Sequence, residues 1–374
     1  MDFAQSARNS GLVGSSIQGL NTASSLFIAL LGSFFVNTNR QWLLAKRPNG
    51  MVTQENFEYV ETPIPEPAEG QVLVRNLFLS FDPTQRGWME DRESYLPPVA
   101  IGAPMRAGSV GQVSESRHPD FAQGDLVQTT GGWQDFVIAA PDQGPMGLSK
   151  VPDGITPEMM LSVLGITGLT AYFGLLDLGK PEPGETVLVS GAAGATGSVA
   201  GQIARIKGCR VVGIAGGAAK CAWLKDEAGF DAVIDYKQGN VSDQIRVTCP
   251  GKVDVYFDNV GGDILEAALN HINLRARVVM CGGISGYNAT EPLPGPANLM
   301  NLVTNRARME GFIILDYLPR ASEAIANLLQ WIGDGDLKYQ IDLQHGFDNI
   351  PGTLSRLFTG ENLGKQLLQI ADPS

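Results

Sequence analysis

The chain has 374 residues, of which 44% are hydrophobic, so it can bury at least one large core, and its length favours two domains over one. The 39 Asp and Glu residues outnumber the 27 Lys and Arg residues and leave a net charge of −12. This charge argues against a nucleic-acid-binding surface and against binding to anionic membranes.

Residues 1–39 are predicted to be an N-terminal extension, dominated by an apolar run at residues 23–36. The run is too short to span a bilayer comfortably. It has the size of the apolar region of a signal peptide, but Arg8 is the only basic residue before it and no A-x-A cleavage site follows it. We therefore favour a poorly ordered extension over a targeting segment, and we expect the rest of the chain to be soluble.

Residues 40–160 contain short segments of strand character that are separated by prolines. Polar and apolar residues alternate in Gln71–Arg75, Gly111–Val113 and Trp133–Val137, and Leu126–Val127 follows a Gly-Asp turn. This pattern predicts an antiparallel, partly open β-barrel. The C-terminal residues 336–374 are expected to return to it.

Residues 161–335 show strands that alternate with helices, which is typical of an α/β fold with a parallel sheet. We predict a doubly wound, nucleotide-binding sheet over this range. The expected strands are Thr186–Ser190, Arg210–Ala215, Ala232–Asp235, Val253–Asp258, Arg277–Cys281 and Glu310–Leu315, and the expected helices are Ser198–Lys207, Lys220–Ala228 and Gly262–Ile272.

A glycine-rich turn, Gly191–Gly197, lies between the first of these strands and its helix. Glycine allows the backbone to approach a pyrophosphate, whose charge is then met by the amide groups at the helix N-terminus. We predict that Gly194, Ala195, Thr196 and Gly197 bind a dinucleotide. The alternative is that these small residues serve tight packing alone.

The end of the second strand bears on the choice between NAD and NADP. An acidic residue roughly 20 positions after the glycine turn would bind the ribose 2′-hydroxyl of NAD, and the sequence has none there. Lys220 follows this strand and is able to bind the 2′-phosphate of NADP, although by position alone it is equally consistent with a solvated lysine. The missing acid favours NADP.

Metal-binding and disulfide patterns are missing from the sequence. Its four cysteines include no C-x-x-C pair, and its three histidines form no H-E-x-x-H motif. We expect no bound metal, no disulfide framework and a reducing compartment, namely the cytoplasm. The same pattern argues against a zinc-dependent alcohol dehydrogenase.

Several motifs together resemble those of the zinc-independent branch of the medium-chain dehydrogenase/reductase superfamily. More narrowly, they resemble the family of prostaglandin reductases, 2-alkenal (double-bond) reductases and curcumin reductases. The resemblance covers about residues 40–370 and is carried by Asp82-Pro83, Arg86-Gly87, Gly191–Gly197, Lys207–Gly213, Phe257–Gly262, Cys281–Asn288 and Glu361–Lys365.

The resemblance implies a GroES-like β-barrel domain from residues 40–160 and 336–374, a Rossmann domain from residues 161–335, NADP(H) as cofactor and usually a homodimer. It implies that Lys220 and Tyr236 contact the 2′-phosphate and that Asn259 lines the cofactor site. The residues that it implies around the nicotinamide are Cys281, Tyr287, Phe312 and Asn362.

Each of these residues also has a purely structural interpretation. Tyr236 would then cap a sheet edge, and Cys281 and Phe312 would belong to the core. Asn259 and Asn362 each precede a glycine-containing turn, where asparagine is common for local hydrogen bonding.

The reaction that the resemblance implies is reduction of a C=C bond conjugated to a carbonyl group. Hydride adds to the β-carbon and leaves negative charge on the carbonyl oxygen, which requires a hydrogen-bond donor. A tyrosine hydroxyl with an ordinary pKa near 10 stays protonated and donates at neutral pH. We predict that Tyr287 is this catalytic donor.

One motif departs from the family pattern. Many relatives read Asp-Pro-Tyr-Met-Arg-Gly where this chain has Thr84 and Gln85 between Pro83 and Arg86. Because threonine is too short to replace the tyrosine, we expect either that Tyr95 or Trp88 fills the substrate pocket beside Thr84, or that the enzyme acts on different substrates from the mammalian eicosanoid reductases. Trp133 is a further aromatic candidate for this cleft, although all three aromatic residues are also consistent with packing.

Two alternatives to the enone reductase stay open at this point. A quinone reductase of the same superfamily would also oxidise NADPH. A protein of another class, one that binds NADPH without turnover, would keep the same fold and cofactor motifs.

Overall fold

The computed structural model describes residues 38–144 and 147–373. The predicted extension and its apolar run lie outside these residues, apart from Thr38 and Asn39. Both belong to strand β1 (Thr38–Leu44), which pairs with β2 (Phe57–Pro63), so the extension that we predicted is two residues too long. Asn39 is buried, and its side-chain amide is satisfied by two hydrogen bonds of 2.9 Å with the backbone of Phe136.

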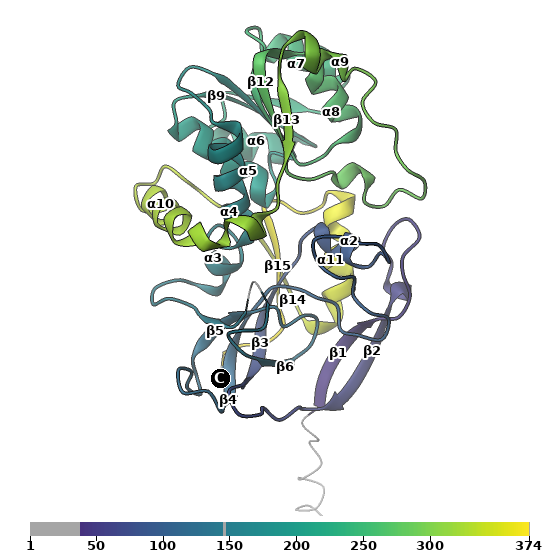
Figure 1. The fold of residues 1–374 in the computed structure, drawn as a ribbon, viewed down its shortest axis with the longest axis vertical. Helices are drawn as coiled ribbons and strands as arrows, with labels where there is room; N and C mark the ends of the chain where they lie inside the picture. Colours follow the sequence, from purple (N-terminus) through teal and green to yellow (C-terminus); the bar gives the residue numbers. More distant parts are fainter. Residues whose placement is uncertain (1–37, 145–146, 374) are drawn as a thin grey trace, which may run out of the picture. The chain divides into compact units, whose positions relative to one another are not determined.

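A seven-stranded sheet forms the β-rich part of the chain (Figure 1). Its order is β14-β15-β3-β4-β5-β7 with β6 also paired to β3, and every pair except β14 with β15 is antiparallel, as predicted. The strands are β3 (Val72–Ser80), β4 (Ser109–Ser116), β5 (Leu126–Thr129), β6 (Phe136–Ala139), β7 (Ser149–Lys150), β14 (Ile341–His345) and β15 (Lys365–Gln369).

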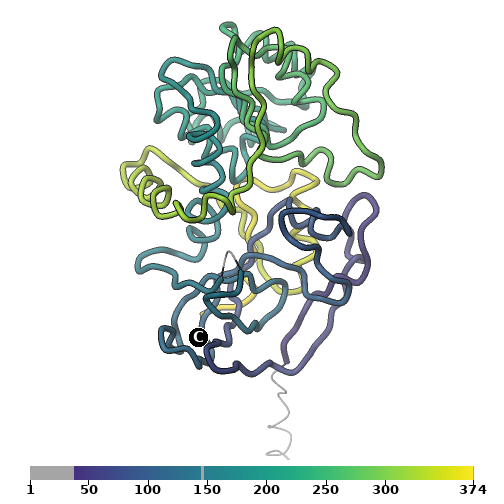
Figure 2. The backbone as a smooth tube through the Cα atoms, in the orientation of Figure 1, coloured from purple at the N-terminus to yellow at the C-terminus, as the bar shows by residue number. Residues whose placement is uncertain are grey.

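The C-terminal residues return to this sheet (Figure 2). Strand β15 pairs with β3, with Leu367 opposite Ser80. Lys365, at the start of β15, is buried, and its ammonium group donates to the carbonyl oxygen of Phe81 at 3.1 Å and forms an ion pair with Asp82. Two sequence motifs that lie almost 300 residues apart are thereby joined.

A six-stranded parallel sheet forms the second part, in the order β10-β9-β8-β11-β12-β13. The chain thus runs outward from β8 to one edge and then from β11 to the other, which is the doubly wound arrangement of a Rossmann sheet. The predicted α/β fold is confirmed. The strands are β8 (Thr186–Ser190), β9 (Arg210–Ala215), β10 (Ala232–Asp235), β11 (Val253–Asp258), β12 (Ile272–Met280) and β13 (Arg308–Gly311).

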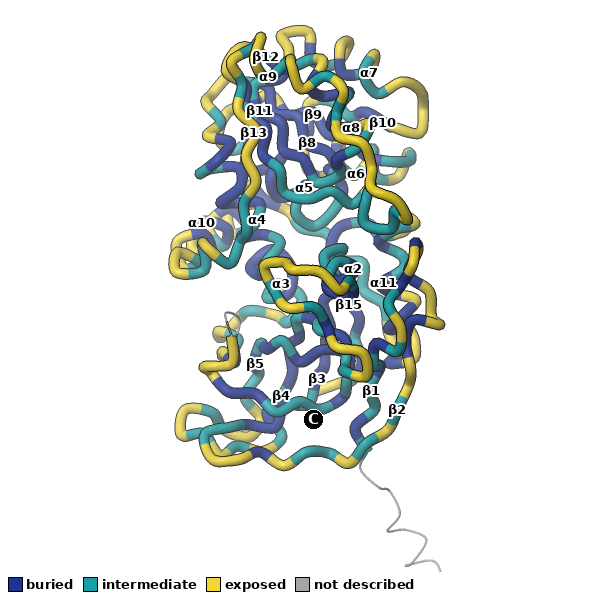
Figure 3. The backbone as a smooth tube through the Cα atoms, turned by 45° about the vertical axis from the view of Figure 1, so that its right-hand side comes forward, coloured by how far each residue is buried: buried dark blue, intermediate teal, exposed yellow. Residues whose placement is uncertain are grey.

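Helices cover both faces of the parallel sheet, whose central strands are buried (Figure 3). Val187 and Val189 of β8 pack on one face with α4, α5 and α10, and Leu188 packs on the other with α7 and α8. The α-helices of the described residues are α2 (Thr84–Trp88), α3 (Pro157–Leu161), α4 (Ile166–Phe173), α5 (Ala195–Ile206), α6 (Ala218–Asp226), α7 (Val241–Thr248), α8 (Gly262–Leu269), α9 (Met300–Thr304), α10 (Ala321–Gly333) and α11 (Ile350–Thr359). Shorter turns are η1 (Gln54–Asn56), the π-helical η2 (Gly174–Gly179), η3 (Ile284–Gly286), η4 (Ile314–Arg320) and η5 (Phe347–Asn349).

Five predicted elements of the α/β part have different bounds in the structure, and α5, α6 and β12 begin earlier than predicted. Helix α8 ends at Leu269, and Ile272 already begins β12 because it pairs with Val253 across a register irregularity. Strand β13 is Arg308–Gly311 rather than Glu310–Leu315, because the chain leaves the sheet after Gly311 and turns into η4. Within residues 38–144 and 147–373, no helix is long and apolar enough to cross a membrane.

Candidate functional site

The glycine turn connects β8 to α5 at the carboxyl edge of the parallel sheet. Gly191 has φ +57°, and Gly194 is the N-cap of α5. A Cβ on Gly197 would lie 2.5 Å from the carbonyl oxygen of Gly191, so only glycine lets the helix start this close to the turn. The predicted residues Gly194, Ala195, Thr196 and Gly197 therefore form the first turn of α5, where the free amide groups favour an anion.

A buried carboxylate organises the neighbouring loop after β11. Asp258 is fully buried and accepts hydrogen bonds from the hydroxyls of Ser190 and Tyr256, both at 2.7 Å, and from the backbone amides of Val260 and Gly261 at 3.0 and 3.1 Å. Burial, with a smaller contribution from Asp258, raises the pKa of Tyr256 well above its ordinary value. The Tyr256 hydroxyl therefore stays protonated and donates to the carboxylate.

This network places Asn259 against the glycine turn. The side-chain amide of Asn259 donates to the carbonyl oxygen of Ser190 at 2.7 Å, and its backbone amide donates to the Ser190 hydroxyl at 2.9 Å. A Cβ on Gly191 would lie 3.3 Å from the Cβ of Asn259. Asn259 thus lies beside the predicted dinucleotide turn, and the sequence analysis missed the role of Asp258 in holding it there.

The ends of β9 and β10 form a second part of the site. The ring of Tyr236 lies against Gly216, where a Cβ would be 2.6 Å from it, and Tyr236 is 43% exposed. The carboxylate of Asp235 accepts from the backbone amides of Gly217 and Lys237, both at 3.0 Å, and these bonds lower its pKa. The carboxylate of Asp235 therefore stabilises the turns that follow β9 and β10.

Lys220 reaches from α6 to the C-terminal part of the chain. Its ammonium group donates to the carbonyl oxygen of Gly360, the C-cap of α11, at 2.8 Å. Burial, and then the nearby Lys237, lower its pKa. The structure thus gives Lys220 a partner that the sequence analysis missed, at the negative end of a helix.

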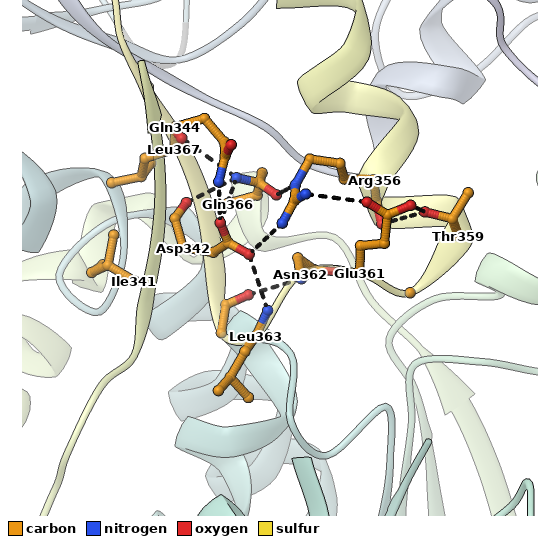
Figure 4. A network of polar contacts seen from close by, with 12 residues as sticks. Ile341, Asp342, Gln344, Arg356, Thr359, Glu361, Asn362, Leu363, Gln366 and Leu367 are labelled. Atoms are coloured by element: carbon orange, nitrogen blue, oxygen red, sulfur yellow. Dashed lines mark hydrogen bonds and ion pairs between the residues drawn. The ribbon is translucent and has the colours of Figure 1, made fainter. Parts of the chain in front are cut away.

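The segment 360–364 also contacts the glycine turn. The backbone amide of Gly364 donates to the carbonyl oxygen of Ala193 at 2.9 Å, and the side chain of Asn362 donates to the carbonyl oxygen of Gly364 at 3.0 Å. Asp342 anchors the segment by accepting from Arg356 at 3.0 Å and from the backbone amide of Leu363 at 3.4 Å (Figure 4). The predicted residue Asn362 therefore lies on a fixed segment beside the turn.

A cavity of about 590 Å³ opens at the ends of β12 and β13. Its lining includes Cys281, Gly282, Gly283 and Phe312. The ring of Phe312 packs against Gly174, where a Cβ would be only 2.5 Å away. Burial, with a smaller contribution from Asp258, raises the pKa of Cys281 to about 12, so the thiol is protonated and neutral at physiological pH.

The hydroxyl of Tyr287 lies beside this cavity, because it bonds to Gly283 of the lining, although Tyr287 is not itself a lining residue. It follows η3, and its oxygen accepts a hydrogen bond from the backbone amide of Gly283 at 3.3 Å. Burial raises the pKa of Tyr287, and the neighbouring Cys281 and Tyr95 act in the same direction. Because the oxygen is the acceptor in this contact, the hydroxyl proton is available to a group bound in the cavity.

The three predicted pocket residues from the β-rich part form one cluster. Thr84 and Trp88 are the ends of α2, and both bond to the hydroxyl of Tyr95, Thr84 through its own hydroxyl and Trp88 through its indole nitrogen at 3.3 Å. Trp88 is buried, whereas Tyr95 is 44% exposed. Trp133 is fully buried against Phe57 and Phe81. Its role is therefore packing in the core rather than binding of substrate.

In the described part of the chain, no three His, Cys, Asp or Glu side chains are grouped to hold a metal ion. All four cysteines are free thiols.

Replacing Asp258 with Asn should lower the free energy of unfolding by about 2–3 kcal/mol, because an amide leaves buried donors without an acceptor. Chemical denaturation followed by tryptophan fluorescence measures the change. The matched control is Asp263→Asn in the exposed first turn of α8, which should change the value by less than about 0.5 kcal/mol. Equal losses for the two variants would contradict the structural role of Asp258.

Comparisons with known proteins bear on the family of this chain. The family model described as the N-terminal domain of oxidoreductase matches residues 40–146, and the model described as zinc-binding dehydrogenase matches residues 195–333. The NADPH-dependent curcumin reductase of Escherichia coli is 43% identical over 339 residues, which are 89% of this chain and 97% of that protein. Prostaglandin reductase 1 of Bos taurus is 36% identical over 333 residues, which are 88% of this chain and 98% of that protein.

The crystal structure of CurA from Vibrio vulnificus in complex with NADPH superposes with a TM-score of 0.84 at 42% sequence identity. The match covers 89% of this chain and 100% of that one. Together with the motifs, these matches establish that the chain belongs to the zinc-independent branch of the medium-chain dehydrogenase/reductase superfamily, in the family of prostaglandin, 2-alkenal and curcumin reductases.

Proposed function

We propose that this protein is an NADPH-dependent oxidoreductase that reduces the C=C bond of α,β-unsaturated aldehydes and ketones. The observation that carries the proposal is the hydroxyl of Tyr287 beside the cavity, because its oxygen accepts from Gly283 and its proton remains available. The relatives named curcumin reductase and prostaglandin reductase support the same reaction class.

The residues at the site fit NADPH. The amides of the first turn of α5 suit a pyrophosphate, and Lys220 supplies a cation for the 2′-phosphate. Tyr236 offers an exposed ring beside Gly216. Asp235 is bound to backbone amides, so its carboxylate does not compete for the ribose. Asn259 and Asn362 flank the glycine turn.

When bound, NADPH supplies a hydride to the β-carbon of the substrate. The electron pair of the C=C bond then forms the new double bond between the α-carbon and the carbonyl carbon, the carbonyl electron pair moves onto oxygen, and Tyr287 donates a hydrogen bond to that enolate oxygen. A buried phenol suits this task because its raised pKa keeps the proton in place at neutral pH. Water supplies the proton for the α-carbon. Cys281 and Phe312 contribute an uncharged surface at the nicotinamide end.

The substrate pocket is formed by α2 and the residues that follow it. Thr84 and Trp88 bond to the hydroxyl of Tyr95, whose ring is partly exposed. The phenol of Tyr95 takes the place of the tyrosine that many relatives carry at position 84. A flat, conjugated and apolar substrate would pack against this ring.

We also propose the domain division, assembly and location of the protein. The GroES-like domain would comprise residues 40–160 and 336–374, and the Rossmann domain residues 161–335. A second copy would bind along β13, an edge strand whose residues are exposed, next to the exposed side chains of Met300 and Val303. The free thiols suit the cytoplasm.

An initial-rate screen tests the proposed function. The panel holds short enals, cyclic enones, curcumin-like dienones, oxo-eicosanoids and quinones, each with NADPH and with NADH. We expect turnover of enals or enones with NADPH. Turnover of quinones alone would favour a quinone reductase, and NADPH binding without turnover of any compound would indicate a binding protein.

Lys220→Ala should raise the KM for NADPH by about 10- to 100-fold and leave the KM for NADH nearly unchanged, because a charge-assisted hydrogen bond is worth about 1.5–3 kcal/mol. Steady-state kinetics with both cofactors measures this. Lys225→Ala, at an exposed position in the last turn of the same helix, is the control. A similar increase for both cofactors would remove the argument for the 2′-phosphate.

Tyr287→Phe should lower kcat by about 100- to 1000-fold, as loss of an oxyanion donor does elsewhere, while the KM for NADPH stays near that of the wild type. Because the pKa of Tyr287 is raised, the wild-type rate should not fall at basic pH until the pH exceeds about 10. Tyr59→Phe, in β2, is the control. An unchanged kcat would reject Tyr287 as the donor.

A further inference from the structure

Arg86 belongs to one of the motifs that carry the family resemblance, yet none of the functions above uses it. It lies in the middle of α2 and is 2% exposed. Its guanidinium group donates to Glu90 at 3.0 Å and to the carbonyl oxygens of Pro48 and Gly50 at 3.4 and 3.3 Å. A buried arginine with this many partners is held in a single orientation.

The fourth partner of Arg86 lies outside the β-rich part. Its Nε donates to the side-chain oxygen of Asn288 at 3.2 Å. Asn288 directly follows Tyr287 in the chain. The loop packs against the same region a second time, because Thr290 lies 3.3 Å from the position of a Cβ on Gly50. The contact therefore joins α2 to the loop of the parallel sheet that carries the phenol.

The start of the loop is already held from outside, because the backbone amides of Ile284 and Ser285 donate to the carbonyl oxygens of Asn259 and Val260 at 3.3 and 3.1 Å. After Ser285, the backbone amides of Tyr287 and Ala289 donate to Ile284 and Gly286 at 3.3 and 3.1 Å, and both of these bonds lie within the loop. The 3.3 Å bond from Gly283 to the phenol is long for a hydrogen bond of this type. The bond from Arg86 to Asn288 therefore adds an outside anchor on the C-terminal side of the phenol.

We propose that Arg86 is a positioning residue, which holds the hydroxyl of Tyr287 at the cavity through its hydrogen bond to Asn288. The inference rests on the proposed function, in which Tyr287 stabilises the enolate. Small displacements of a catalytic group cost large factors in rate, so an anchor on the neighbouring residue controls kcat. The carboxylate of Glu90 offsets the burial that lowers the pKa of Arg86, so the guanidinium stays charged.

The test removes the acceptor rather than the buried arginine. Asn288→Ala should lower kcat for trans-2-hexenal with NADPH by about 10- to 100-fold and leave the KM for NADPH unchanged. In the Tyr287→Phe background, the same substitution should lower kcat by less than about twofold further, because the group that it positions is already missing. Glu291→Ala, an exposed residue of the same loop, is the matched control and should keep wild-type kcat in both backgrounds.

A second measurement does not depend on turnover. Amide hydrogen exchange of residues 284–290, without cofactor, should be faster in Asn288→Ala than in the wild type or in Glu291→Ala. Arg86→Lys should reproduce both effects, because an ammonium group is able to pair with Glu90 but lacks the fork that also reaches Asn288. If Arg86→Lys does not fold, Asn288→Ala still tests the inference.

The outcomes separate the inference from the proposed function. If Tyr287→Phe lowers kcat but Asn288→Ala does not, the inference is wrong and the role of Tyr287 stands. Equal losses from Asn288→Ala in the two backgrounds, or unchanged exchange of residues 284–290, would also overturn the inference. If Tyr287→Phe keeps wild-type kcat, the proposed role of Tyr287 and the inference fall together.

Discussion

The buried carboxylate of Asp258 is the interaction on which the geometry of the cleft depends. Its donors are two hydroxyls and two backbone amides, all neutral. In a medium of low polarity, a charge that lost one of these donors would be costly, so the network holds a single arrangement. Its carbonyl oxygen also accepts from the amides of Cys281 and Gly282. The ends of β8, β11 and β12 are thereby assembled around one residue.

The other wall of the cleft comes from segments that are distant in the chain. In a doubly wound sheet, the carboxyl ends of the strands leave a crevice at the point where the strand order reverses, and something must cover it. Here the segment 360–364 contacts Ala193 and Lys220, and α2 contacts Asn288. The ion pair of Asp82 and Lys365 links these two covering segments to each other. The glycine turn, Lys220 and the loop that carries Tyr287 therefore each contact the β-rich part.

The sequence predicted the central strands of the parallel sheet well, because β8, β9, β10 and β11 are short apolar runs bounded by turns. It predicted the start of β12 poorly, because Asn273 and Arg275 are polar and interrupt the apolar run. Helices α10 and α11 were not predicted. The amphipathic patterns of both helices were overlooked. Asn349 precedes α11 without a side-chain cap, so the start of α11 has no local signal.

Within the candidate site, local patterns identified the glycine turn but not the contacts that hold it. The bond from Lys220 to Gly360 and the bond from Arg86 to Asn288 span 140 and 202 residues, so no periodicity or spacing reveals them. The signal for Asp258 was present, since an acidic residue that ends a largely buried strand needs buried donors. The packing of Trp133 likewise depends on Phe57 and Phe81, which lie far away in the sequence.

The electrostatics of the cleft fit a reaction in which negative charge appears only after hydride transfer. Burial keeps both Cys281 and Tyr287 protonated, so neither side chain adds charge to the proposed nicotinamide end, and Asp316 is the charged residue of the cavity lining. A neutral donor discriminates between a carbonyl and an enolate, because its hydrogen bond strengthens as charge develops. A fixed cation would stabilise a bound anion before the reaction as well.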